Sequence, residues 1–230
     1  MPERDAPEKE QAPGLPRLPP GRHGLDRDFV AQNQRDRLTA GIIAAVAEGG
    51  YHDTTVTQIC AAAGVSRRTF YSYFSSKEEC YLRAFDLVAE HLSSAMGEAG
   101  EVGDEWPVVV RERIVAMLSI FAANPDLVRF ALVAPLRAGE EIAAYYRQGV
   151  ERILENLGEG RPREGTRQPA PAIEQALIGG MIALIAHKVE AGEGEALPSL
   201  EPDLVELFLS PYVGREIAVK AAGSSPGPIR

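Results

Sequence analysis

The sequence predicts an all-α protein in which a small N-terminal domain of three helices precedes a larger helical domain. Apolar residues recur at three- and four-residue steps along most of the chain. No segment shows the alternation typical of a strand, and no repeat of about 20–50 residues is found. With 230 residues, 45% of them hydrophobic, the chain is long enough to bury a sizeable core. We expect an arm at 1–28, domains at 29–80 and 81–222, and a tail at 223–230.

The first 21 residues contain six prolines and no apolar periodicity, which predicts a disordered arm. Its few cations leave two interpretations open, an inert tail and an arm that touches a nucleic acid. A helix is then predicted from Phe29 to about Glu48, because Leu38, Ile42 and Val46 share one face. The pair Gly49-Gly50 ends it.

Two short helices are predicted next, joined by a tight turn. Thr54-Thr55 offers an N-cap for a helix from about Val56 to Ala63. Gly64 sits at the turn, where a positive φ is least costly for glycine. Ser66 caps a second helix from about Arg67 to Tyr73.

The spacing within this segment separates a small core from an exposed face. Ile59, Val65 and Phe70 are placed to pack between the two helices, and Cys60 is small enough for their close approach. The second helix then exposes Arg67, Arg68, Thr69, Tyr71 and Tyr73.

The rest of the chain is predicted to be helical as well. Ser75-Ser76 precedes a long helix whose apolar stripe consists of Tyr81, Phe85, Val88, Leu92 and Met96. Further helices are expected around Ile114–Ala122, from Asn124-Pro125 onward, at Ile142–Leu157, at Ala172–His187 and at Leu204–Ala222. Residues 158–171, rich in Gly, Pro and Arg, predict a flexible loop.

Two of these helices carry further expectations. The helix at Ala172–His187 is apolar almost all round, so we expect it to be buried on several sides. Pro211 lies inside the last helix and should kink or split it.

Charge and composition limit the class of protein. The net charge is −9, yet residues 22–83 carry 8 basic and 7 acidic side chains, while residues 84–230 carry 13 and 22. An acidic body repels phosphates except where cations are placed. No apolar run is long enough for a membrane span or a signal peptide, and two cysteines do not indicate a disulfide scaffold, so we expect a cytoplasmic protein.

The exposed residue types of the second short helix suit the major groove of DNA. Arginine pairs bidentately with guanine edges, and threonine bonds a base edge or touches the thymine methyl. Tyrosine hydroxyls and Lys77 can fix phosphates, and the helix N-termini near Thr55 and Lys77 add backbone donors. The plainer interpretation is a three-helix packing unit with a solvated arginine pair.

Residues from about Arg35 to Phe85 resemble the DNA-binding domain of the TetR family of regulators. The matching landmarks are AEGGY (Ala47–Tyr51), TTVTQI, AAAGVS at the turn, TFYSYF and SKEE. The resemblance implies phosphate contacts at Thr55, Tyr73 and Lys77, and major-groove contacts at Ser66, Arg67, Arg68, Thr69 and Tyr71. Thr57 stands where many members carry a base-reading arginine; threonine is shorter.

The resemblance also implies a DNA-binding transcriptional regulator, a repressor by the family's usual behaviour. It would bind a palindromic operator as a homodimer and be released by a small, mostly hydrophobic effector. The last two long helices would pack against their copies, with Gly179-Gly180 allowing close approach. A helix simply buried in the monomer core is the alternative.

An effector pocket in the second domain has several candidate residues, although most aromatic residues at helical spacing are simply core. They are Trp106, Met117, Phe121, Phe130, Tyr145, Tyr146 and His187. Arg111 and Arg137 are candidates to meet an anionic group, or are simply solvated.

Other functions find less support in the sequence. No clustered metal-ligand spacing, phosphate loop or nucleophile–base pair occurs, so we expect no metal, no cofactor and no enzyme activity. A redox switch between Cys60 and Cys80 is a weaker alternative to two buried thiols. The rival to a regulator is a structural, nucleoid-type DNA-binding protein without an effector.

Overall fold

The computed structural model describes residues 27–100 and 105–223, and every element in these ranges is helical. The predicted all-α fold is therefore confirmed. The predicted arm lies outside the described residues, apart from the first two residues of α1. The elements are α1 (Arg27–Asp53), α2 (Val56–Ala63), α3 (Arg67–Tyr73), α4 (Lys77–Glu98), α5 (Trp106–Ala123), α6 (Asp126–Val128), η1 (Arg129–Val133), η2 (Ala134–Arg137), α7 (Glu140–Gly158), α8 (Pro171–Glu190), η3 (Gly194–Leu200), α9 (Glu201–Val213) and α10 (Arg215–Ala222).

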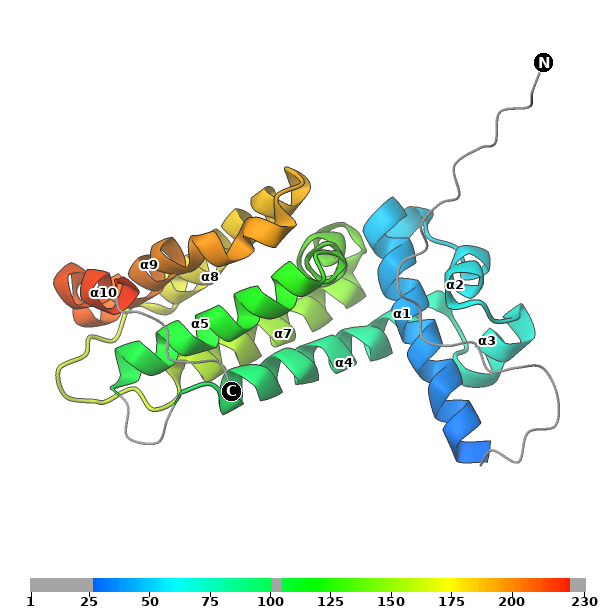
Figure 1. Ribbon diagram of the computed structural model, residues 1–230, viewed down its shortest axis with the longest axis horizontal. Helices are drawn as coiled ribbons and strands as arrows, with labels where there is room; N and C mark the ends of the chain where they lie inside the picture. The colour runs from blue at the N-terminus through cyan, green and yellow to red at the C-terminus, as the bar shows by residue number, and fades with distance from the viewer. Residues whose placement is uncertain (1–26, 101–104, 224–230) are drawn as a thin grey trace, which may run out of the picture.

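The helices form an elongated body with α1, α2 and α3 gathered at one end (Figure 1). The long helix α4 runs away from them beside α5 and α7, while α8 and α9 lie on the other side of α5. One hydrophobic core runs through the whole body, from Leu38 in α1 to Tyr212 in α9. The N-terminal helices are thus joined to the rest through α4 and a shared core.

The helix-turn-helix segment has the local structure that its sequence predicts. Thr55 caps α2, accepting from the Gln58 amide while the Gln58 side chain accepts from the Thr55 amide. Gly64 has φ 60° and ψ 37°, a left-handed conformation that lets the chain reverse between α2 and α3. Ser66 caps α3 by accepting from the Thr69 amide at 3.0 Å.

Two predicted helices are less regular than their periodicity indicates. The one expected from Asn124 is the short α6 followed by the π-helical η1 and the 3-10 turn η2. The one expected at Leu204–Ala222 is divided at Gly214, which has φ 84° and ψ 156°. Pro211 itself lies within α9, so the predicted break is present but glycine makes it.

The expectation that α8 is buried on several sides is wrong. Its buried side chains are Leu177, Ile178, Met181, Ile185 and Val189, which form one stripe. Ala172, Ala176, Gly179 and Ala183 are exposed. By length and composition alone α8 passes the test for a membrane span, as does the α5–η2 pair, which is bent by 106°. An apolar helix with one face in a protein core passes the same test.

Candidate DNA-binding helix and effector cavity

The outward face of α3 is held in place by its buried face. Phe70 is fully buried against α1 and α2, and its ring contacts that of Tyr71 with centroids 5.3 Å apart. The Arg37 guanidinium donates to the Gly64 carbonyl at 2.6 Å, which ties α1 to the turn. α1 and α2 approach so closely that a Cβ on Gly41 would lie 2.8 Å from the Ala63 Cβ. The position of α3 is therefore fixed by its packing against α1 and α2.

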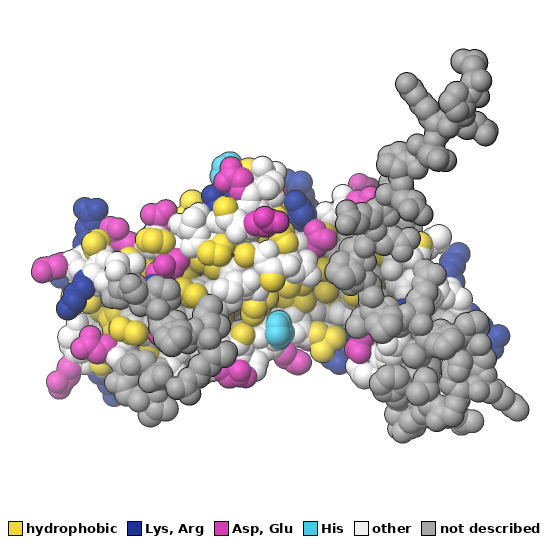
Figure 2. Space-filling model, in the orientation of Figure 1, with side chains coloured by type: hydrophobic (Ala, Val, Ile, Leu, Met, Phe, Trp, Pro, Cys, Tyr) yellow, Lys and Arg dark blue, Asp and Glu magenta, His cyan; other side chains and the backbone are white. Residues whose placement is uncertain are grey.

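Six of the nine predicted DNA-contacting residues are exposed: Thr55, Thr57, Ser66, Arg67, Arg68 and Tyr71. Within the described residues, the guanidinium groups of Arg67 and Arg68 and the hydroxyl of Tyr71 have no hydrogen-bond partner. Figure 2 shows basic side chains at the outer edge of the molecule, beyond α2 and α3. The geometry suits base and phosphate contacts from this face.

Some of the predicted residues already have a partner inside the protein. The hydroxyls of Ser66 and Thr69 are 2.9 Å apart, and Thr55 donates to Gln58 at 2.7 Å. The half-buried Tyr73 donates to Gln34 at 2.8 Å. Capping and core contacts thus occupy some of the hydroxyl groups for which DNA contacts are predicted.

Lys77, for which a phosphate contact is predicted, has several partners within the protein. Its ammonium donates to the carbonyls of Tyr51 at 2.7 Å and Thr54 at 2.8 Å, with a longer contact to His52 at 3.4 Å. It also lies 4.2 Å from the ring centroid of Tyr51. Burial lowers the pKa of Lys77, and the charge of Asp53 opposes that shift.

Sequence reasoning missed a cation beside α3. Arg35 of α1 is exposed, and its guanidinium lies 5.3 Å from the ring centroid of Tyr73. Nothing in the spacing of the first helix marks this residue, because an arginine on an exposed helix face is ordinary. Its position becomes informative only once α1 and α3 are seen to cross.

A cavity of about 790 Å³ lies between α7, α8 and the η1–η2 segment. Most of its wall is aliphatic, from residues such as Leu132, Val150, Leu154, Ile178 and Ile182. Arg137, Arg147, Glu151 and His187 are among the polar groups that border it. An apolar wall with a polar border is typical of a site for a mainly hydrophobic small molecule.

Only two of the seven predicted effector residues, Tyr146 and His187, line this cavity. Met117 and Phe121 border a separate void of about 20 Å³ within the core. Phe130 is fully buried against Tyr81, and Trp106 donates to the Leu157 carbonyl at 3.0 Å.

Two further candidates, Tyr145 and Arg111, also have partners outside the cavity. Tyr145 donates to the Asp86 carboxylate at 2.8 Å, which raises the pKa of its hydroxyl. Arg111 forms an almost fully buried ion pair with Glu201 at 2.6 Å. Neither is among the cavity-lining residues. The aliphatic residues that do line it carry no signal that separates them from core.

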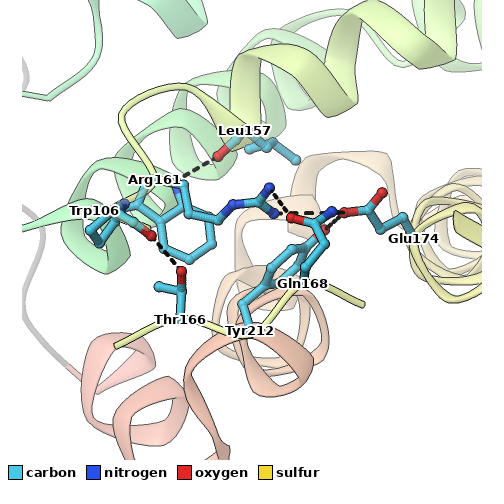
Figure 3. Close-up of polar contacts among 8 residues, drawn as sticks. Trp106, Leu157, Arg161, Thr166, Gln168, Glu174 and Tyr212 are labelled. Carbon is cyan, nitrogen blue, oxygen red and sulfur yellow. Dashed lines mark hydrogen bonds and ion pairs between the residues drawn. The ribbon is translucent and has the colours of Figure 1, made fainter. Parts of the chain in front are cut away.

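The loop predicted to be flexible is bonded to the helices around it (Figure 3). Arg161 lies 5.0 Å from the ring centroid of Tyr212 and 3.6 Å from the carboxylate of Glu174. Glu174, a cavity-lining residue, also accepts from the Tyr212 hydroxyl at 3.0 Å. The loop is therefore tied to α8 through Glu174 and to α9 through Tyr212.

The two cysteines are both buried. Burial raises the pKa of the Cys80 thiol to about 12, so the reactive thiolate is scarce at neutral pH. This environment does not favour a redox switch. Among the described residues, no group of three or more His, Cys, Asp or Glu side chains is arranged to hold a metal ion.

Residues 38–84 match the protein family described as bacterial regulatory proteins, tetR family. These residues therefore have the sequence of a TetR-type helix-turn-helix domain. The match spans the last part of α1, the helix-turn-helix and the start of α4, which is where the sequence landmarks lie. No curated protein is significantly similar in sequence to the chain.

Solved structures of TetR-like regulators share the fold. The fatty acid degradation regulator FadR from Bacillus halodurans is 20% identical, with a TM-score of 0.64 over 76% of this chain and 94% of that one. A TetR-family regulator from Marinobacter aquaeolei VT8 is 21% identical, with a TM-score of 0.61 over 77% and 97%. The transcriptional regulator FadR from Bacillus subtilis, in complex with stearoyl-CoA, is 20% identical, with a TM-score of 0.61 over 76% and 98%.

Proposed function

We propose that the chain is a transcriptional regulator of the TetR family, a cytoplasmic repressor that binds a palindromic operator as a homodimer. A small, mostly hydrophobic effector in the α7–α8 cavity releases it. Residues 29–80 form the DNA-binding domain in this proposal, and residues 81–222 bind the effector and the second copy. The observation that carries it is the outward face of α3, where Arg67, Arg68 and Tyr71 are exposed on a helix fixed by the Gly64 turn.

The proposed dimer forms through α8 and α9. The exposed residues Ala172 and Ala176 form a row of small side chains on α8, one turn apart, and neither lines the cavity. Beside them Ile173 and Leu184 are 47% and 40% exposed, although both are large and apolar. A second copy packed against this face would bury apolar surface that one copy leaves in water.

The proposed effector is aliphatic rather than aromatic. Leu, Val, Ile, Ala and Pro side chains make up about half of the residues that line the cavity, and Arg137, Arg147, Glu151 and His187 are among the polar ones. That the structurally similar FadR from Bacillus subtilis was solved with stearoyl-CoA supports an effector with a long apolar part. Binding would shift the population between dimer arrangements and so lower operator affinity.

A thermal-shift screen separates the proposal from a structural DNA-binding protein without an effector. A ligand that binds only the folded state raises the melting temperature by mass action. We expect a rise with aliphatic probes such as stearate or stearoyl-CoA, and a lower affinity for the operator at the same probe concentration. Melting temperatures unchanged across a broad panel of apolar probes would favour the structural protein.

Selection of bound fragments from genomic DNA tests the operator. Wild-type protein should enrich fragments with an inverted repeat whose half-sites lie about 10 base pairs apart, centre to centre. Arg68→Ala should relax the preference at one position of each half-site, at a cost of about 1–3 kcal/mol. Equal loss of affinity for random DNA would show that Arg68 does not read a base.

A further inference from the structure

The ammonium group of Lys77 has no donor left for a DNA phosphate. A lysine ammonium has three N–H donors, and those of Lys77 are directed at the carbonyls of Tyr51, His52 and Thr54, at 2.7, 3.4 and 2.8 Å. The ring of Tyr51 covers the group from another side, with its centroid 4.2 Å from Nζ. A phosphate could be reached only by giving up contacts that this half-buried cation already makes.

The contacts of Lys77 join three helices. Its carbonyl partners lie at the end of α1 and in the turn before α2, while Lys77 is the first residue of α4. The buried Thr54 secures the same turn by donating to the Gly50 carbonyl at 2.7 Å. The position of Thr55 and of the α2 N-terminus relative to α4 therefore depends on this group.

Arg35 has the opposite environment. Its side chain is exposed, and within the described residues it takes part in no hydrogen bond or ion pair. Tyr73 is the last residue of α3, and the Arg35 guanidinium packs over its ring. The Tyr73 hydroxyl donates to the Gln34 side chain, so the ring beneath Arg35 is itself bonded to α1.

The place of Arg35 beside α3 matches the path of a DNA backbone. If the outward face of α3 enters the major groove, a cation next to the C-terminal end of α3 lies at the edge of that groove, where the phosphates run. Planar guanidinium groups also suit phosphate oxygens, which they bind through two parallel hydrogen bonds.

We propose that Arg35, seated on Tyr73, neutralises a phosphate of duplex DNA beside α3, and that Lys77 is a positioning residue that neutralises none. This inference rests on the proposed DNA-binding function. It differs from the sequence resemblance, which implies a phosphate contact at Lys77 and assigns no role to Arg35.

The salt dependence of operator binding tests the assignment. For each phosphate neutralised, the slope of log K against log salt changes by about 0.9. Arg35→Gln should therefore flatten the slope by about 1.8 for two protomers. Lys77→Met should leave the slope unchanged and weaken binding by the same factor at every salt concentration, because it displaces α2. Arg215→Gln, which changes an exposed cation of α10 at the opposite end of the body from α3 (Figure 1), serves as the control.

Amide hydrogen exchange gives a second readout for Lys77. Lys77→Met should speed exchange in the turn before α2 while exchange in α8 is unaffected, and the same test with Lys77→Gln covers the case that the methionine variant does not fold. A flatter slope with either Lys77 variant, or an unchanged slope with Arg35→Gln, would overturn the assignment. Wild-type protein that selects no DNA sequence would instead overturn the proposed function itself.

Discussion

The hydroxyl of Tyr81 in α4 donates a hydrogen bond of 2.7 Å to the carbonyl of Phe130 in the π-helical segment η1. The two rings also pack together, with centroids 4.5 Å apart. The ring centroid of Tyr81 also lies 5.0 Å from that of Tyr51 in α1. Leu132 and Val133, which follow Phe130 by two and three residues in η1, line the cavity. The cavity wall and the end of α1 therefore meet at a single buried tyrosine.

Replacing Tyr81 with phenylalanine should lower the free energy of unfolding by about 1–2 kcal/mol. The ring packing is kept, but a buried hydrogen bond is lost and the Phe130 carbonyl loses a donor. Urea denaturation followed by circular dichroism measures the change. Tyr145→Phe is the matched control: its hydroxyl bonds a carboxylate near the surface, so its loss should be smaller. Equal losses in both variants would contradict this account.

Gly41→Ala should destabilise the N-terminal helices by about 1–3 kcal/mol, because overpacking forces the backbone to move. A Cβ at Gly41 would lie 2.9 Å from the Ala63 nitrogen and the Ile59 carbonyl oxygen, neither of which can rotate away. Gly49→Ala provides the control. A Cβ there meets nothing within 4 Å, so the higher helix propensity of alanine should leave stability equal or slightly higher. Thermal melts of the two variants, with DNA binding measured in parallel, distinguish them.

The predictability of the helix-turn-helix from sequence follows from how local its determinants are. Thr55, Gly64 and Ser66 each act within a few residues of the chain, through caps and a positive φ, so their types disclose their roles. Gly41 was not foreseen as a contact point, because its role depends on how α1 crosses α2. Local chemistry is visible in the sequence, whereas helix crossing is not.

The residues that line the cavity are also hard to predict, because they depend on how the helices cross. The sequence offers mainly aromatic candidates, but the indole N–H of Trp106 bonds the Leu157 carbonyl and the hydroxyl of Tyr145 bonds the Asp86 carboxylate. The cavity wall is aliphatic, and Ile178 and Ile182 repeat at the same spacing as any core residue of α8. Likewise the sequence marked Lys77 as a phosphate ligand by position, while the structure gives its donors to carbonyls.

The start of α4 should make a pH-dependent contribution to stability through Glu79. Its carboxylate accepts from the amide and the hydroxyl of Ser75, both at 2.6 Å, and these bonds lower the pKa of Glu79 below its ordinary value of 4.5. The ionised form is therefore favoured by folding, so the contribution is present above pH 4.5 and is lost as the pH falls through the lower folded-state pKa.

The measurement is the difference in unfolding free energy between wild type and Glu79→Ala over a pH series. The difference should be constant near neutral pH and shrink in acid. Ser75→Ala removes one of the two donors and should reduce the part that depends on pH. A difference that stays constant down to about pH 3 would show that the Ser75 bonds do not stabilise the carboxylate.

Filling the cavity from its wall should abolish binding of apolar probes without unfolding the protein. Ala186 is half-buried on the cavity side of α8, so Ala186→Phe places a ring in the cavity rather than in the packed core. We expect the affinity of the native protein for an anilinonaphthalene dye, measured by the fluorescence of the bound dye, to fall at least about tenfold, the equivalent of 1.4 kcal/mol. Ala62→Phe, on the exposed side of α2, should bind the dye as wild type does. Unchanged dye affinity in Ala186→Phe would place the binding site elsewhere.

A charge on the outward face of α8 should separate the proposed dimer. Ala176 is exposed, does not line the cavity and lies in the row of small residues on that face. In a symmetric interface Ala176→Glu introduces two buried carboxylates without partners, so dimer affinity should fall at least about tenfold, or 1.4 kcal/mol. Sedimentation at a series of concentrations measures it, and Ser119→Glu on the exposed side of α5 is the control. Because one α3 reaches only one half-site, operator affinity should fall along with dimerisation while the preferred half-site sequence stays the same. An Ala176→Glu protein that remains dimeric would exclude this face of α8 from the interface.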